Sequence, residues 1–162
     1  MTITITRDRS HKMRHVATVR QHAIALDEPV ANGGEDLGVG PHDLYDSALG
    51  ACKALTVLWY AQRKQIPVED IRVTVERDDS EERKGVYRLR TVLHLTGALS
   101  EAQRQELLTV AGKCPVHKLM TQAKAWQQAI ALCGGRGRGA LQPDGGDDPR
   151  AQEHSGSQRA GC

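Results

Sequence analysis

A single long helical pattern dominates the middle of this sequence. Between His42 and Gln65, apolar and small residues recur at intervals of three and four, and the pattern stops before Pro67. This periodicity predicts a helix over about 42–65. In its middle turns the apolar residues cover most of the circumference, which is typical of a buried helix; they include Leu44, Ala48, Ala51, Cys52, Leu55, Leu58 and Trp59. A domain of about 130 residues cannot cover so many apolar faces, so we expect an obligate homodimer with a large apolar interface.

Shorter patterns on both sides of this helix predict strands and two further helices. Alternation with a period of two marks strands at 2–6, 13–19, 22–26, 71–76 and 86–95. Ser100 and Gln103 form a capping box that starts a helix ending near Gly112, and Pro115 is typical of the first position of another helix. The segment 126–132 is ambiguous, and we interpret it as a strand. Because strands and helices come in blocks, the sequence predicts an α+β fold with antiparallel sheets.

The composition changes abruptly after Cys133. The segment from Gly134 to Cys162 holds 8 of the 16 glycines and few large apolar side chains. Such a segment cannot bury enough apolar surface to offset the entropy that is lost when it becomes ordered. We therefore expect a folded domain over residues 1–133 and a disordered Gly-rich tail over residues 134–162.

Charge and hydropathy limit the partners of this chain. Its 22 basic residues nearly balance its 20 acidic ones, so no large field of one sign attracts nucleic acid. No apolar run approaches the roughly 18 residues of a membrane span, and the alternating segment Met1–Thr6 is not a secretory signal. We expect a cytoplasmic protein with no nucleic-acid or membrane partner. In that reducing compartment its four cysteines would be free, catalytic or metal-binding rather than a disulfide framework.

The first unusual cysteine, Cys52, lies in the middle of the predicted long helix. Its neighbours Ala48, Gly50 and Ala51 are small, so another backbone or a ligand could approach closely. A small buried core residue is the simpler interpretation, since free cysteine is among the most buried residue types. A reactive thiol is the alternative.

The second, Cys114, precedes Pro115 at a predicted helix start. Backbone N–H groups, the helix dipole and the neighbouring Lys113 and Lys118 favour a thiolate at such a position. Cys114 is therefore a candidate redox thiol or metal ligand. With His117 it has the spacing of half a zinc site, which would need two further ligands such as Cys52 and His42. We interpret Cys133 and Cys162 as incidental.

Several segments carry a family likeness when they are taken together. They are His22–Pro29, Gly33–Asp36, Gly40-Pro41, Asp43-Leu44, Ala48–Cys52 and Lys113–His117. An Ala-Leu-Gly-Ala-Cys helix followed about sixty residues later by Lys-Cys-Pro-Val-His is the most specific part. In these features the chain resembles the OsmC/Ohr family of thiol-dependent hydroperoxide reductases, and within it the general OsmC-like branch, over roughly residues 13–132.

The resemblance implies a fold, an assembly and a reaction. Two chains would intertwine as a homodimer, with antiparallel sheets around two central helices and the active sites near the interface. Cys52 would be the peroxidatic cysteine and Cys114 the resolving cysteine. An organic hydroperoxide would oxidise Cys52 to a sulfenic acid, Cys114 would condense with it to a disulfide, and an external dithiol reductant would restore both thiols. The resemblance implies no metal and no organic cofactor.

One part of the family pattern differs in this sequence. In the peroxide-resistance branch an arginine and a glutamate organise the nucleophile, and the glutamate follows a proline ten residues before the cysteine. Here His42 follows Pro41 at that position, and Asp43 matches the acidic residue of the OsmC-like branch instead. The arginine comes from the N-terminal strands. We assign it to Arg20, with Arg14 as the second choice.

Two other functions stay open at this point. The chain could be a binding module of the same fold, which holds a small ligand or a metal without peroxidase activity. It could also be an interaction protein that uses its tail. The reactivity of the two thiols distinguishes a peroxidase from the binding module, because a peroxidase loses two thiols per chain when it reacts with a peroxide.

Overall fold

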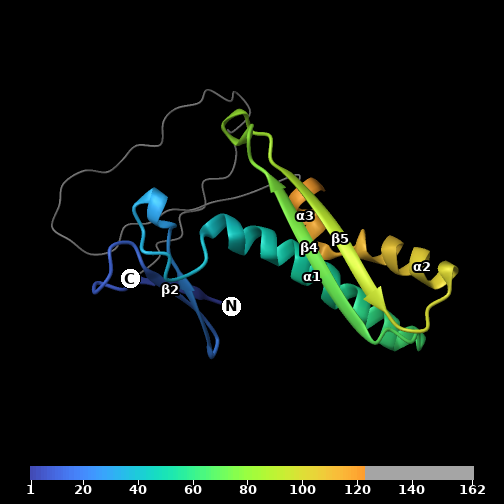
Figure 1. Ribbon diagram of the computed structural model, residues 1–162. Helices are drawn as coiled ribbons and strands as arrows, with labels where there is room; N and C mark the ends of the chain where they lie inside the picture. The colour runs from blue at the N-terminus through green and yellow to red at the C-terminus, as the bar shows by residue number, and fades with distance from the viewer. Residues whose placement is uncertain (123–162) are drawn as a thin grey trace, which may run out of the picture. The chain divides into compact units, whose positions relative to one another are not determined.

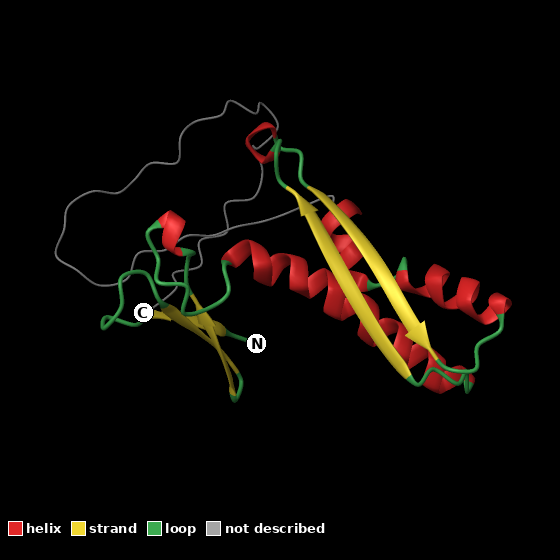
Figure 2. Cartoon of the chain, in the orientation of Figure 1, coloured by secondary structure: helices red, strands yellow, loops and turns green. Residues whose placement is uncertain are grey.

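The computed structural model describes residues 1–122. In this range, blocks of strands and helices follow one another along the chain (Figures 1 and 2). The elements are β1 (Ile3–Arg7), β2 (His15–Val19), β3 (His22–Leu26), α1 (Pro41–Lys64), β4 (Asp70–Asp78), β5 (Arg88–Thr96), α2 (Glu101–Ala111) and α3 (Pro115–Gln122). The predicted α+β class is confirmed. The predicted strand at 126–132, the predicted tail, Cys133 and Cys162 lie outside the described residues.

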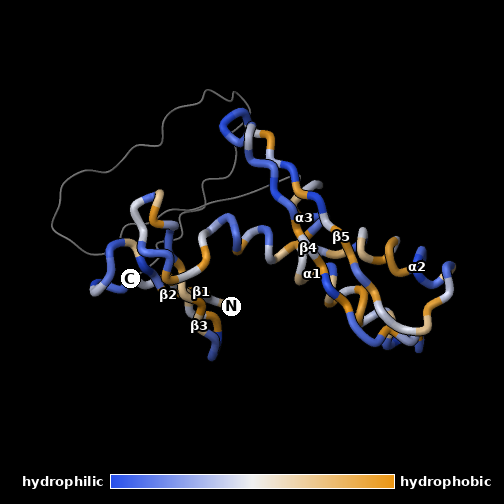
Figure 3. The backbone as a smooth tube through the Cα atoms, in the orientation of Figure 1, coloured by the Kyte–Doolittle hydropathy of each residue, from blue (hydrophilic) through white to orange (hydrophobic). Residues whose placement is uncertain are grey.

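The strands form two antiparallel sheets, as predicted. In the first, β2 lies between β1 and β3, and Ile3 pairs with Val19. The second is the long hairpin of β4 and β5, whose register runs from Asp70 opposite Thr96 to Asp78 opposite Arg88. The tip of this hairpin is hydrophilic (Figure 3). A charged tip keeps its backbone in water, so the hairpin can pack through its middle and base.

Helix α1 has well-defined signals at both ends. Gly40 is extended, Pro41 occupies the first helical position, and Asp43 Oδ2 accepts the Gly40 N–H at 3.1 Å. A carboxylate there satisfies a backbone donor that the first turn leaves without a partner, and it complements the helix dipole. At the other end Gln65 takes the left-handed conformation that commonly terminates helices. The predicted helix at 42–65 is thus confirmed to within one residue at each end.

The core lies between α1, α2 and the β4–β5 hairpin. Val57 and Leu107 are completely inaccessible to solvent, and Ala61 and Ala111 nearly so. Partly buried side chains from the hairpin and its connections pack against this cluster: Val68, Ile71, Leu93, Leu95 and Leu99. Because the sequence contains no phenylalanine, this core is built mainly from aliphatic side chains.

Gly50 sets the distance between α1 and β4. A Cβ at this position would lie 2.9 Å from Cγ2 of Val75, closer than a real contact allows. Since Val75 is branched at Cβ, it has little rotameric freedom to move aside. The small residue two positions before Cys52 therefore serves close packing of helix on hairpin.

Part of the apolar surface of α1 is left uncovered in the single chain. Leu55 and Trp59, one turn apart, are 66% and 62% exposed, and Leu119 of α3 is 67% exposed. We call Leu55 and Trp59 the exposed stripe. The expectation of a fully buried helix is therefore not met by one chain alone. Within residues 1–122, no helix combines the length and the apolar character needed to cross a bilayer.

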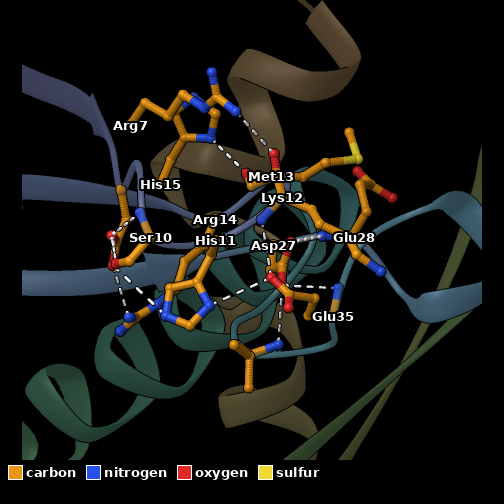
Figure 4. A network of polar contacts seen from close by, with 12 residues as sticks. Arg7, Ser10, His11, Lys12, Met13, Arg14, His15, Asp27, Glu28 and Glu35 are labelled. Carbon is orange, nitrogen blue, oxygen red and sulfur yellow. Dashed lines mark hydrogen bonds and ion pairs between the residues drawn. The ribbon is translucent and has the colours of Figure 1, made fainter.

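A polar network ties the β1–β2 connection to the loop after β3 (Figure 4). Asp27 is buried, and its carboxylate accepts N–H groups from Glu28, Glu35 and Leu37. Burial acts to raise the pKa of Asp27, but these three donors hold it below its usual value. The Glu35 side chain in turn accepts the N–H of Lys12 at 2.9 Å. Together these bonds fix the irregular segment that leads into α1.

Candidate functional site

Cys52 lies in the middle of α1 and is half-buried. Residues three and four apart share a helix face, so Cys52 lies on the same side of α1 as Thr56 and the exposed stripe. Gly50 faces β4, whereas α1 also contacts α2 and α3. The Cys52 thiol is free.

Cys114 is completely inaccessible to solvent and sits directly before α3. Its Sγ accepts the N–H of His117 at 3.3 Å, and Pro115 is the first helical residue. This is the geometry of an N-cap in which sulfur replaces the usual oxygen. The predicted helix start at Cys114-Pro115 is confirmed.

Cys52 in α1 and Cys114 at the start of α3 lie at the contact of these two helices. Burial raises the pKa of Cys114, and the neighbouring Cys52 thiol raises it further. The His117 N–H and the Lys53 ammonium act in the opposite direction. The result is one half-buried and one fully buried thiol at the contact of α1 with α3.

A second polar cluster lies nearer the N-terminus of α1. Arg77 of β4 donates from Nε to Asp46 Oδ2 at 2.5 Å and from Nη2 to Asp43 Oδ1 at 2.7 Å. Tyr87 Oη donates to Asp46 Oδ1 at 2.9 Å, and burial together with this bond raises the pKa of Tyr87 to about 12. Hydrogen bonds to Asp43 and Asp46 raise the pKa of Arg77 above its usual value. The cluster therefore holds its arginine charged and its tyrosine neutral.

Asp43 belongs to this cluster and makes no hydrogen bond or ion pair with the described thiols. The Arg77 guanidinium, followed by the Gly40 N–H, holds the pKa of Asp43 below its usual value. Asp43 precedes Cys52 by nine residues, which corresponds to about 13 Å along a helix. Sequence analysis missed Arg77. It continues the alternating series Ile71, Val73 and Val75, whose side chains face inward from β4. A charged residue on the inward face of a half-buried strand was the signal that could have identified it.

The arginines chosen from sequence lie in the N-terminal sheet region. Arg20 has φ of 56° in the turn between β2 and β3; its side chain is exposed and makes no hydrogen bond or ion pair within residues 1–122. Arg14 Nη1 donates to Asp8 Oδ2 at 2.9 Å (Figure 4). Within one chain, no hydrogen bond or ion pair joins either side chain to the described cysteines. His42, at the position where the family pattern differs, is exposed and pairs with Glu82 at 2.7 Å.

Two cavities border these groups. One of about 500 Å³ lies between α1 and β4, beside the Arg77 cluster, and Gly50 and Ala51 form part of its wall. The other, of about 550 Å³, lies between α1 and α2. Its lining includes Thr56, one turn after Cys52, and Lys113, next to Cys114; Trp59, Tyr60 and Val110 contribute to the same wall. In the described part of the chain, no group of three or more His, Cys, Asp or Glu side chains is arranged to hold a metal ion.

The chain is thus a small α+β protein with two cysteines at the contact of α1 with α3. The family model described as OsmC-like protein matches residues 33–128, and the chain belongs to the OsmC family. This confirms the resemblance that the sequence carries. Among the curated proteins, none matches the chain significantly.

Solved structures show the same fold at low sequence identity. An OsmC-like protein from Mycoplasma pneumoniae is 23% identical, with a TM-score of 0.61 over 75% of this chain and 86% of that one. The organic hydroperoxide resistance protein OsmC from Legionella pneumophila is 22% identical, with a TM-score of 0.54 over 75% and 90%. OhrB of Bacillus subtilis, also an organic hydroperoxide resistance protein, is 20% identical, with a TM-score of 0.51 over 75% and 92%.

Proposed function

We propose that this protein is a thiol-dependent peroxidase that reduces organic hydroperoxides in oxidative-stress defence, with Cys52 as the peroxidatic and Cys114 as the resolving cysteine. The observation that carries the proposal is the placement of the two cysteines where α1 contacts α3, with Cys52 half-buried and Cys114 fully buried. Structural neighbours named as organic hydroperoxide resistance proteins support the same role. Oxidation of a thiol by a peroxide and condensation of the sulfenic acid with a second thiol need no metal or organic cofactor.

The proposed reduction of a hydroperoxide has three steps. The Cys52 thiolate attacks the terminal peroxide oxygen, the O–O bond breaks, and the alkoxide leaves and takes a proton to become an alcohol. The Cys114 thiolate then attacks Sγ of the Cys52 sulfenic acid, and hydroxide leaves and takes a proton to become water. An external dithiol reduces the resulting disulfide and is itself oxidised to a disulfide.

Burial supports this assignment of roles. Cys52 is half-buried and Cys114 is fully buried, so a peroxide reaches Cys52 first. Burial and the Cys52 thiol raise the pKa of Cys114, so Cys114 stays protonated until Cys52 has reacted with the peroxide. Oxidation of Cys52 removes its thiol, and one of the groups that oppose ionisation of Cys114 is then lost.

The cavity between α1 and α2 supports organic rather than inorganic peroxides. Its wall includes Trp59, Tyr60 and Val110, which offer apolar contacts to an alkyl or aryl group beside the polar Glu106 and Thr109. Thr56 and Lys113 place this wall beside both cysteine-bearing segments. An apolar peroxide would gain binding energy here that hydrogen peroxide cannot obtain.

The proposed active form is a homodimer. The exposed stripe of α1 is apolar surface that a second copy of the chain would cover, as expected for a homodimer. Arg20, exposed in its hairpin turn, is our candidate for the cation that activates Cys52, with Asp43 as the acidic partner nearer the helix start. A cytoplasmic location suits a site that must be reduced again after each turnover.

One equivalent of cumene hydroperoxide, followed by intact mass measurement and peptide mapping, tests the proposal. We expect a loss of about 2 Da and a peptide that links Cys52 to Cys114. Hydrogen peroxide at the same concentration should give a slower reaction. A protein that keeps both thiols after the organic peroxide, while it still binds a small apolar ligand or a metal, would be a binding module instead.

A further inference from the structure

Lys53 is a buried cation beside the two thiols. It follows Cys52 on α1 and is only 6% exposed. Its Nζ donates to the carbonyl oxygen of Ala111 at 3.3 Å, and no carboxylate pairs with it within residues 1–122. Burial of an ammonium group is costly unless other groups compensate for the lost water. Packing alone therefore does not explain why an unpaired lysine is buried next to a cysteine.

The hydrogen-bond partner of Lys53 lies close to Cys114 along the chain. Ala111 is the last residue of α2, where the unpaired carbonyls form the negative end of the helix dipole. Cys114 follows three residues later, so the hydrogen bond joins the Cys52 helix to the segment that carries the second thiol. Lys113, by contrast, is exposed although it adjoins Cys114 in sequence, and water screens its charge.

The groups that face Cys114 come from two helices. Cys52 and Lys53 approach from α1, and the His117 N–H approaches from α3. Burial and Cys52 favour the neutral thiol, whereas the His117 N–H and Lys53 favour the thiolate. Among these groups, the Lys53 ammonium supplies a positive charge.

We propose that Lys53 is a positioning residue for the second thiol: its ammonium holds the end of α2 against α1 and stabilises the Cys114 thiolate. The inference rests on the proposed function. Negative charge develops on Cys114 twice in that cycle. Cys114 is the nucleophile when the Cys114 thiolate displaces hydroxide from the Cys52 sulfenic acid. If the reducing dithiol attacks Cys52, the thiolate of Cys114 is the leaving group, and a stabilised thiolate leaves faster.

Three substitutions separate the charge of Lys53 from its hydrogen bond. Lys53→Arg keeps both, Lys53→Gln keeps a donor without a charge, and Lys53→Met removes both. All are made in the full chain with Cys133 and Cys162 replaced by serine, so that only the described thiols titrate. Lys64→Met, an exposed lysine near the end of the same helix, is the matched control.

The first readout does not depend on peroxidase activity. With Cys52→Ser added, ionisation of Cys114 is followed by the ultraviolet absorbance of the thiolate against pH. We expect Lys53→Met and Lys53→Gln to move the curve upward by about one pH unit, and Lys53→Arg and Lys64→Met to leave it near its original place. An unchanged curve in Lys53→Gln would overturn the inference while the peroxidase proposal stands.

The second readout is the rate of disulfide formation after a pulse of cumene hydroperoxide. With both thiols present, Lys53→Met should form the disulfide about tenfold more slowly near pH 7, and the rates should converge at high pH where every variant is ionised. A uniform slowing at all pH values would mean a structural role only and would overturn the inference. If the unmodified protein forms no disulfide, the proposed function fails, and the role of Lys53 in the cycle fails with it.

Discussion

Arg77 and Asp46 form a short ion pair, 2.5 Å from Nε to Oδ2, which joins the second half of β4 to the first turns of α1. The Asp46 side chain is 10% exposed and the Arg77 side chain 28%. The same guanidinium reaches Asp43, so one residue of the hairpin holds two carboxylates of the helix. The pair lies on the side of α1 that faces the hairpin, whereas the thiols lie toward α2 and α3.

Substitution of Arg77 should destabilise the fold. Arg77→Met leaves the buried Asp46 carboxylate with Tyr87 as its remaining side-chain donor, and we expect a loss of about 2 kcal/mol in the free energy of unfolding. Urea denaturation measures it. Arg90→Met is the control, because Arg90 and Glu76 form an exposed pair at 2.8 Å that should contribute less than about 0.5 kcal/mol. Equal effects of the two variants would contradict the importance of the buried pair.

The pH dependence of stability should include a contribution from Asp43. Hydrogen bonds from Arg77 and Gly40 lower the pKa of Asp43 in the folded state below its unfolded value. The stabilisation is therefore complete above the unfolded pKa of about 4 and is lost as pH falls through the folded pKa. Since the side chain is 53% exposed, we expect Asp43→Asn to melt only about 2 °C below the unmodified protein at pH 7.

This difference should shrink as the pH is lowered toward about 3, where the carboxylate of the unmodified protein becomes protonated. Thermal melts monitored by circular dichroism at several pH values test the trend. A gap that widens toward acid would show that the sign of the pKa shift is wrong.

The two cysteines should respond differently to substitution. Cys52→Ser should abolish reduction of organic hydroperoxides, because a serine hydroxyl is too weakly acidic to replace the thiolate. Cys114→Ser should still react once, and its Cys52 should then be oxidised further to sulfinic acid, a gain of about 32 Da, since no thiol traps the sulfenic form. Intact mass after peroxide measures both. Identical behaviour of the two variants would argue against the assigned roles.

The exposed stripe should form a dimer interface. We expect light scattering at micromolar concentration to give the mass of two chains. Trp59→Glu should weaken the association at least about 30-fold, because a charge would replace a large buried aromatic side chain. Lys64→Glu changes the charge of an exposed residue of the same helix and should leave the dimer intact. A monomer in the unmodified protein would contradict the proposed assembly.

Arg20 should affect the first oxidation and not the later disulfide. If its guanidinium favours the reacting thiolate, Arg20→Ala should slow the reaction of Cys52 with cumene hydroperoxide about tenfold near pH 7. Arg9→Ala, another exposed arginine of the N-terminal region, is the control. Stopped-flow measurement of thiol loss distinguishes them. Equal rates in the two variants would remove Arg20 from the site.

The local elements of this protein could be predicted from its sequence, because each depends on residues that are close along the chain. The period of three and four predicted α1, the Ser100–Gln103 capping box predicted the start of α2, and Pro115 predicted the start of α3. The setting of Cys114 at a helix start was predicted in the same way, and the family followed from motifs within continuous segments.

The contacts between distant segments were decided by tertiary structure alone. Arg77 meets Asp46 across 31 positions, and Lys53 meets the Ala111 carbonyl across 58. Neither partner could be chosen from sequence, because many charged residues have similar patterns and only the packing of α1 against β4 and α2 decides which come together. For the same reason the sequence indicated an excess of apolar surface on α1, but only the fold shows that Leu55 and Trp59 are among the residues left uncovered.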